Sequence, residues 1–257
     1  MTDSTTFQAP QPLGVGSIIS ESFSILGRNI LSVVVLALGP TLLGLVISGL
    51  LVGWGVTLGA GSVSPGDISI PMVILSAVIQ IALAGVTTGL LIQLAYDAKL
   101  GKPVTPMAYI APALAVIVPL TVLSFVAGLA AGIATLALII PGLWVYAVFS
   151  VMPAAVIIEK VGFGGLGRSV ELTREYRWPI VGAVILMGIC NFVIQLVAGF
   201  VIGLIAGSTG IVGALIVMGL LSAVTYGLGS ILVALIYARL REIKEGTSVR
   251  DIAAVFD

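Results

Sequence analysis

The sequence has no histidine among its 257 residues and a single cysteine, Cys190. Without histidine the chain cannot form a Ser-His-Asp or Cys-His catalytic set, and it lacks the commonest nitrogen ligand for zinc. One cysteine forms no internal disulfide, and its position in an apolar run favours a packing role. We therefore predict a protein that is not an enzyme and that has no cofactor or metal site.

Charged residues are also scarce. They make up 9% of the chain, whereas a soluble domain carries about 25%, and hydrophobic residues make up 59%. The mean hydropathy is +1.25. So few charges cannot cover a globular surface, which indicates a helical membrane protein. The net charge of zero gives no reason to expect nucleic acid as a partner.

Long apolar stretches predict six transmembrane helices, because a bilayer core about 30 Å thick needs about 20 helical residues. Residues 117–158 are too long for one span, and Pro141-Gly142 is the natural break since proline lacks the N–H that a helix interior requires. The fourth span is then short, and it either lies where the bilayer is locally thin or begins slightly before the break. The predicted spans are residues 30–56, 70–96, 117–140, 142–158, 180–206 and 211–238.

The positive charges predict the orientation of these spans. With six spans, every lysine and arginine falls on one side, and the opposite connections (57–69, 141–142 and 207–210) contain none. Lysine and arginine concentrate in cytoplasmic connections, so both termini are expected in the cytoplasm. The cationic residues are Arg28, Lys99, Lys102, Lys160, Arg168, Arg174, Arg177, Arg239, Arg241, Lys244 and Arg250.

The first residues are polar, contain proline and carry no lysine or arginine. They lack the positive start and prompt apolar core of a signal peptide. We therefore expect a disordered tail at 1–13, a six-helix transmembrane domain at 14–246 and a short cytoplasmic tail at 247–257.

Short amphipathic segments precede the first, third and fifth spans. Apolar residues recur at helical spacing in residues 15–30 and 166–176, and more weakly in 106–117. Helices of this kind lie in the membrane interface with the apolar face towards acyl chains. The similarity of residues 90–104 to 231–246 suggests a repeated unit. We predict an all-α polytopic protein with three hairpins and cytoplasmic interfacial amphipathic helices.

The spacing of Gly162, Gly164 and Gly167 matches the phosphate-binding motif of dinucleotide-binding folds. That motif requires a preceding strand, a soluble βαβ unit and an acidic residue about 20 residues later. Residues 182–190 read GAVILMGIC and contain no acid. The glycines are therefore interpreted as a flexible turn before the third amphipathic segment.

Two amides, Asn191 and Gln195, share one face of the fifth span with Gly188 and Gly199. They would either hydrogen-bond a neighbouring helix or line a cavity, and both alternatives stay open. No acidic or basic residue falls near the middle of any span, which argues against a proton-coupled pump or an ion channel.

The remaining candidates lie at the cytoplasmic edge. They would serve either as interfacial anchors joined by salt bridges or as a rim that binds lipid headgroups or a protein partner. These candidate contacts are Glu159, Arg168, Arg174, Trp178, Tyr237 and Arg241.

Residues 141–180, together with the closing YARLREIKEG at 237–246, resemble a bacterial family of six-span proteins. This family includes the membrane domain attached to some glycerophosphoryl diester phosphodiesterases, and stand-alone relatives. The elements that carry the resemblance are Pro141-Gly142, Pro153, Glu159, the glycine-rich turn, Arg168-Ser169, Leu172 and Arg177-Trp178. The resemblance implies six helices with cytoplasmic termini in the bacterial inner membrane. It does not imply phosphodiesterase activity, because in the fused proteins that chemistry belongs to a separate soluble domain.

Two functions fit this description. The first is a non-enzymatic accessory or scaffold protein that organises membrane lipids or a protein partner at its cytoplasmic face. The alternative is a small permease or lipid-handling transporter for a neutral or lipid-like solute, which would use the Asn191 and Gln195 face.

Overall fold

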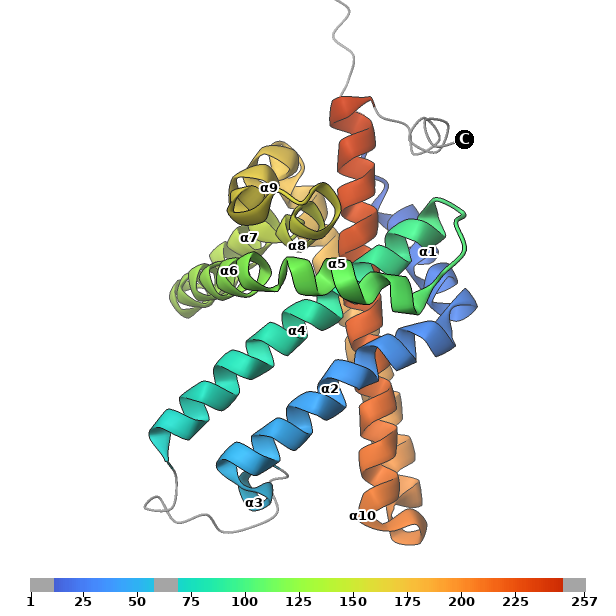
Figure 1. The fold of residues 1–257 in the computed structure, drawn as a ribbon. Coiled ribbons are helices and arrows are strands. Elements are labelled where there is room, and N and C mark those ends of the chain that lie inside the picture. The colour runs from blue at the N-terminus through green and yellow to red at the C-terminus, as the bar shows by residue number, and fades with distance from the viewer. Residues whose placement is uncertain (1–11, 58–68, 247–257) are drawn as a thin grey trace, which may run out of the picture.

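The computed structural model describes residues 12–57 and 69–246, and within these ranges the chain forms helices and turns without a strand (Figure 1). Six segments are long and apolar enough to cross a membrane, which confirms the prediction of an all-helical chain with six such helices. They are Ile30–Val52, Ile70–Lys99, Ile117–Ala137, Ile139–Glu159, Arg177–Phe200 and Val217–Glu245. The predicted tails lie outside the described residues except for positions 12 and 13, and Leu13 is buried.

The helices follow one another with short connections. In chain order they are α1 (Val15–Arg28), α2 (Ile30–Val52), α3 (Trp54–Thr57), α4 (Ile70–Lys99), the 3₁₀ turn η2 (Pro106–Tyr109), α5 (Ile110–Ala115), α6 (Ile117–Ala137), α7 (Ile139–Phe149), α8 (Met152–Ala154), the π-turn η3 (Ala155–Glu159), the 3₁₀ turn η4 (Gly162–Gly164), α9 (Gly165–Thr173) and α10 (Arg177–Glu245).

The element α10 folds back on itself. Gln195 Nε2 lies 3.4 Å from Thr225 Oγ1, although 30 residues of straight helix would separate them by about 45 Å. The chain must therefore reverse between its two apolar segments, Arg177–Phe200 and Val217–Glu245, which lie side by side (Figure 1).

The break between the third and fourth spans lies at Leu138, three residues before the predicted Pro141-Gly142. Leu138 is extended (φ −163°, ψ 148°). Pro141 then falls in the first turn of α7, where no N–H is needed for an intrahelical bond. Gly142 allows close approach, because a Cβ there would lie 2.8 Å from the Cα of Thr135. The fourth span starts slightly before Pro141-Gly142, which is one of the two predicted alternatives, and its 21 residues are enough to cross a bilayer.

The apolar stripe of α1 faces protein rather than acyl chains, which corrects the expectation for this segment. Ile18, Ile25 and Leu26 are buried, and α1 packs against α10. Glu21 on its polar side accepts a hydrogen bond of 2.6 Å from Lys99 Nζ of α4. An amphipathic pattern has the same period in both settings, so the sequence could not distinguish them.

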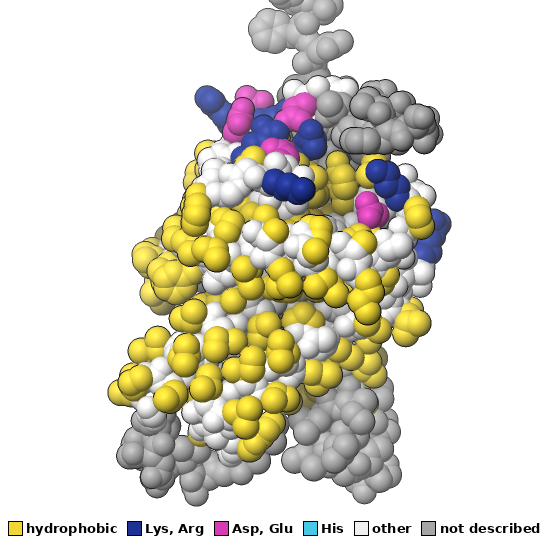
Figure 2. Space-filling view, in the orientation of Figure 1, with side chains coloured by type: hydrophobic (Ala, Val, Ile, Leu, Met, Phe, Trp, Pro, Cys, Tyr) yellow, Lys and Arg dark blue, Asp and Glu magenta, His cyan; other side chains and the backbone are white. Residues whose placement is uncertain are grey.

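Burial is uneven among the spans. Half of the most apolar window is buried in the fourth and sixth spans, compared with 11% in α6. The fourth and sixth spans therefore form the centre of the molecule, and α6 lies at its periphery. Acidic and basic side chains gather at one end, above a broad apolar surface (Figure 2). We call this the charged end; it contains Lys99, Glu159, Arg168 and Arg241.

Candidate functional site

The charged end is built where the fourth span leaves the bundle. The π-turn η3 ends at Glu159, and Lys160 then adopts a left-handed conformation (φ 56°) that redirects the chain. After the short turn η4, α9 begins at Gly165, where a Cβ would lie only 2.4 Å from Val156 Cγ2. This close approach brings Arg168, one turn into α9, back over Glu159.

Five side chains form a connected charge cluster at this end: Glu159, Arg168, Tyr237, Arg241 and Glu245. Arg168 holds Glu159 in a bidentate pair, with Nε to Oε2 at 2.8 Å and Nη2 to Oε1 at 3.0 Å. The Tyr237 hydroxyl donates to Glu159 Oε1 at 2.6 Å. Arg241 donates through Nε to Glu245 Oε2 at 2.8 Å, and Arg168 also bonds Glu245. The charge cluster therefore ties η3, α9 and the end of α10 together.

Packing and electrostatics both favour this arrangement. Tyr237 is fully buried, and the Arg241 guanidinium lies 5.8 Å from its ring centroid, within range of a cation–π contact. The hydrogen bonds that Arg168 donates to Glu159 raise the pKa of Arg168, and this effect exceeds the opposing effect of burial. Two arginines and two glutamates give zero net charge. The cluster is thus internally compensated, which favours a structural role.

The structure brings together four of the six predicted edge residues, namely Glu159, Arg168, Tyr237 and Arg241. Arg174 and Trp178 are exposed outside the cluster. Glu245 was not predicted, although its spacing four residues after Arg241 is typical of a helical ion pair.

The predicted amide face is divided between two environments. Gln195 bonds Thr225 of the sixth span, which agrees with a bond to a neighbouring helix. The Asn191 Oδ1 atom is buried and has no hydrogen-bond partner within the described part of the chain. Neither amide lines the cavity that Thr225 helps to form.

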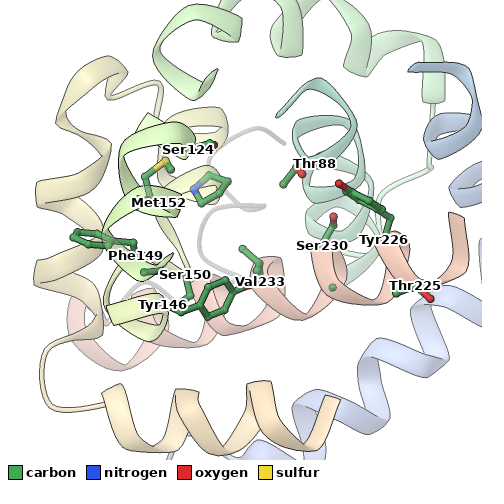
Figure 3. Close-up of a pocket in the computed structure, with 15 residues that line it drawn as sticks. Thr88, Ser124, Tyr146, Phe149, Ser150, Met152, Thr225, Tyr226, Ser230 and Val233 are labelled. Carbon is green, nitrogen blue, oxygen red and sulfur yellow. The ribbon is translucent and has the colours of Figure 1, made fainter. Parts of the chain in front are cut away.

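That cavity has a volume of about 440 Å³ and lies between α4, α6, α7, α8 and α10. In Figure 3, Thr88, Tyr226 and Ser230 lie across a central space from Tyr146, Phe149 and Met152. Its polar lining consists of hydroxyl groups and contains no ionised side chain. The hydroxyl residues are Thr88, Ser124, Tyr146, Ser150, Thr225, Tyr226 and Ser230.

Some of these hydroxyls already have protein partners. Thr88 donates to Ala84 O and Ser150 to Ala147 O, each at 2.9 Å, and Thr225 faces Gln195. For the other four, Ser124, Tyr146, Tyr226 and Ser230, no side-chain hydrogen bond forms within residues 12–57 and 69–246. The cavity thus offers spare hydrogen-bonding capacity in an otherwise apolar setting.

Among the described residues, no group of three or more Cys, Asp or Glu side chains is placed to hold a metal ion. Comparison with known proteins gives no match to a family model, to a curated protein or to a solved structure. The resemblance described above therefore stays a prediction, and the function must be argued from the geometry.

Proposed function

We propose that this chain is a non-enzymatic integral membrane protein of the bacterial inner membrane. It acts as an accessory or scaffold that organises anionic lipid, or a protein partner, at its cytoplasmic face. Six apolar helices support residence in a membrane, and the charged end supplies the face (Figure 2).

The proposed topology is three hairpins with both termini in the cytoplasm and short amphipathic helices at the cytoplasmic interface. Three pairings are consistent with it. α2 packs against α4, α6 packs against α7, and the two apolar segments of α10 meet at Gln195 and Thr225. A reporter protein fused at position 62 tests the topology, because this position should lie outside the cytoplasm. A reporter found in the cytosol would reject the proposed topology.

One observation carries the lipid proposal: the charged end has cations that the charge cluster does not use. Arg28, Lys160 and Arg174 are exposed, and none of the three has an ion pair within the described ranges. Exposed aromatic side chains of Phe163 and Trp178 lie nearby in the sequence. Cations beside aromatic residues are typical of contact with lipid headgroups.

The test reverses these charges and leaves the charge cluster intact. The triple variant R28E/K160E/R174E should lose bound phosphatidylglycerol by at least about tenfold, since each cation contributes about 1 kcal/mol near an anionic surface. Native mass spectrometry from mild detergent measures the retained lipid and any companion protein. The matched control R28K/K160R/R174K keeps the charges and should retain both. Equal retention in the two triple variants would reject the proposal.

The cavity favours a second candidate, a carrier for a neutral or lipid-like solute. Its hydroxyl lining and its link to Gln195 through Thr225 suit such a solute. Flux through reconstituted protein should fall when Asn191 and Gln195 are replaced by leucine. Unchanged flux, or none in the original protein, would exclude this role for the amides.

A further inference from the structure

We propose that the 440 Å³ cavity binds one neutral lipid through a head group that bears hydroxyl or ester carbonyl oxygens, the chemistry of a diacylglycerol. This site is separate from the charged end. The inference goes beyond the proposed function and holds whether or not the protein organises anionic lipid.

The lining selects for a neutral head group. The described wall offers hydroxyls and apolar groups, without an ionised side chain. An ionised phosphate placed there would lose its hydration and find no opposite charge, which is strongly unfavourable in an apolar setting. A neutral oxygen needs only a hydrogen bond, and a hydroxyl can donate or accept one.

Four hydroxyl groups on three helical segments are available to hydrogen-bond a ligand in the cavity. Ser230 and Tyr226 project from the sixth span, Ser124 from α6 and Tyr146 from α7. Because these four hydroxyls have no side-chain bond within the described residues, a ligand oxygen would satisfy groups that the fold leaves open. The loss of one such hydrogen bond should weaken binding by about fivefold.

The size and the rim fit a head group whose chains stay outside. A volume of about 440 Å³ falls within the range of small-molecule sites, about 300–1,000 Å³. Tyr146 and Tyr226 are 45% and 48% exposed, so the cavity opens at these two rings. Neighbouring Phe125 and Leu129 of α6 are exposed apolar residues that suit contact with acyl chains.

The depth of the cavity indicates that the ligand enters from the bilayer. Ser230 and Tyr226 precede Tyr237 of the charge cluster by seven and eleven residues in the same helical segment. At 1.5 Å per residue this places them about 10–17 Å below the charged end. A hydrocarbon core is about 30 Å thick, so the opening faces acyl chains rather than water.

The experiment uses the full chain in mild detergent with dioleoylglycerol as the probe and native mass spectrometry as the readout. A 1:1 adduct is expected. Dioleoylphosphatidic acid, which has the same chains with a charged phosphate, should bind at least about tenfold more weakly. Equal binding of the two lipids, or the absence of a 1:1 dioleoylglycerol adduct, would overturn the proposal.

Variants locate the site. The double variant Y226F/S230A removes two open hydroxyls and should weaken the adduct by about thirtyfold. The control S222A changes a hydroxyl on the same helix that does not line the cavity, and it should bind normally. Normal binding by Y226F/S230A would overturn the assignment.

A filling variant keeps the test independent of hydrogen bonding. A Cβ at Gly229 meets no atom within 4 Å, and this residue lines the cavity, so G229L should fold and occupy the space. It should abolish the adduct, whereas G182L, at an equally open position outside the cavity, should not. A persistent adduct in folded G229L would place the ligand elsewhere.

Discussion

The charge cluster and the cavity are built from the same helices but differ in whether their polar groups have partners. Both draw on the fourth and sixth spans, and they are separated along the last helix by only two to three turns. In the charge cluster, each ionised group has at least one partner within hydrogen-bonding distance. In the cavity, four hydroxyls have no side-chain bond within the described residues. Polar groups that satisfy one another stabilise a fold, whereas polar groups left open are available to a ligand.

The positions of the two regions account for their chemistry. Charges are tolerated at the charged end because water screens them and opposite charges pair them. Within the hydrocarbon a charge would be expensive, whereas a neutral hydroxyl needs only one hydrogen bond, which a ligand can supply. Predictions that separate these two regions follow, in order of decreasing effect.

The largest effect is expected from removing the central carboxylate. Glu159→Ala leaves Arg168 and Arg241 without this partner and frees the Tyr237 hydroxyl. Because the Glu159 side chain is only 16% exposed, the loss should be about 2–4 kcal/mol of stability. A thermal melt in mild detergent would show it as a clearly lower Tm.

The control for this variant is Glu171→Gln. Glu171 also approaches Arg168, at 3.5 Å, but its side chain is 72% exposed, so its Tm should stay unchanged. If both variants had the same Tm, the charge cluster would contribute no more to stability than an exposed ion pair does.

A second variant moves α9 without changing a charge. Gly165→Leu would place side-chain atoms against Val156, where even a Cβ would lie 2.4 Å from Cγ2. Displacing α9 should separate Arg168 from Glu159 and lower stability by about 1–3 kcal/mol. Gly167→Ala, on the same helix with no atom within 4 Å, should melt normally. Equal Tm values for the two variants would refute the close approach of α9.

A matched pair of tyrosines compares the two regions directly. Tyr237→Phe removes a 2.6 Å bond to a carboxylate and should reduce stability by about 1.5 kcal/mol without changing the binding of dioleoylglycerol. Tyr226→Phe removes an open hydroxyl, so it should keep the original Tm and weaken lipid binding. The reverse pattern in melting and native mass spectrometry would invert the roles assigned to the two regions.

The smallest effect is expected where an ion pair is exposed. Arg239 and Glu242 pair at 2.7 Å with side chains 32% and 40% exposed. Glu242→Gln should change stability by less than about 0.5 kcal/mol, since water screens such pairs. A loss as large as that of Glu159→Ala would show that proximity alone, rather than burial, decides the contribution.

Much of the fold could be predicted from the sequence, because hydropathy alone indicates helices that must satisfy their own backbone in lipid. The finer features could not. Pro141 predicts a break at its own position, yet a proline is equally suited to the first turn of a helix. In the structure Pro141 lies in the first turn of α7, and the break is at Leu138. The apolar stripe of α1 packs on α10, but its periodicity would be the same if it faced lipid.

The candidate sites were predictable to different degrees. Glu159 and Arg168 are nine residues apart, so a local turn brings them together, and the sequence identifies both. The cavity hydroxyls come from four separate spans. No pattern within one span shows that Thr88, Ser124 and Ser230 face the same space, because this depends on how the helices are rotated against one another.

The balance of two arginines and two glutamates in the charge cluster has an electrical consequence. Carrying one elementary charge across a membrane potential of 100 mV exchanges about 2.3 kcal/mol with the field. A group of side chains whose charges sum to zero exchanges almost no energy with the field when it moves as a unit. A neutral lipid in the cavity would exchange none either. The charge cluster therefore presents no net charge on which a membrane potential could act.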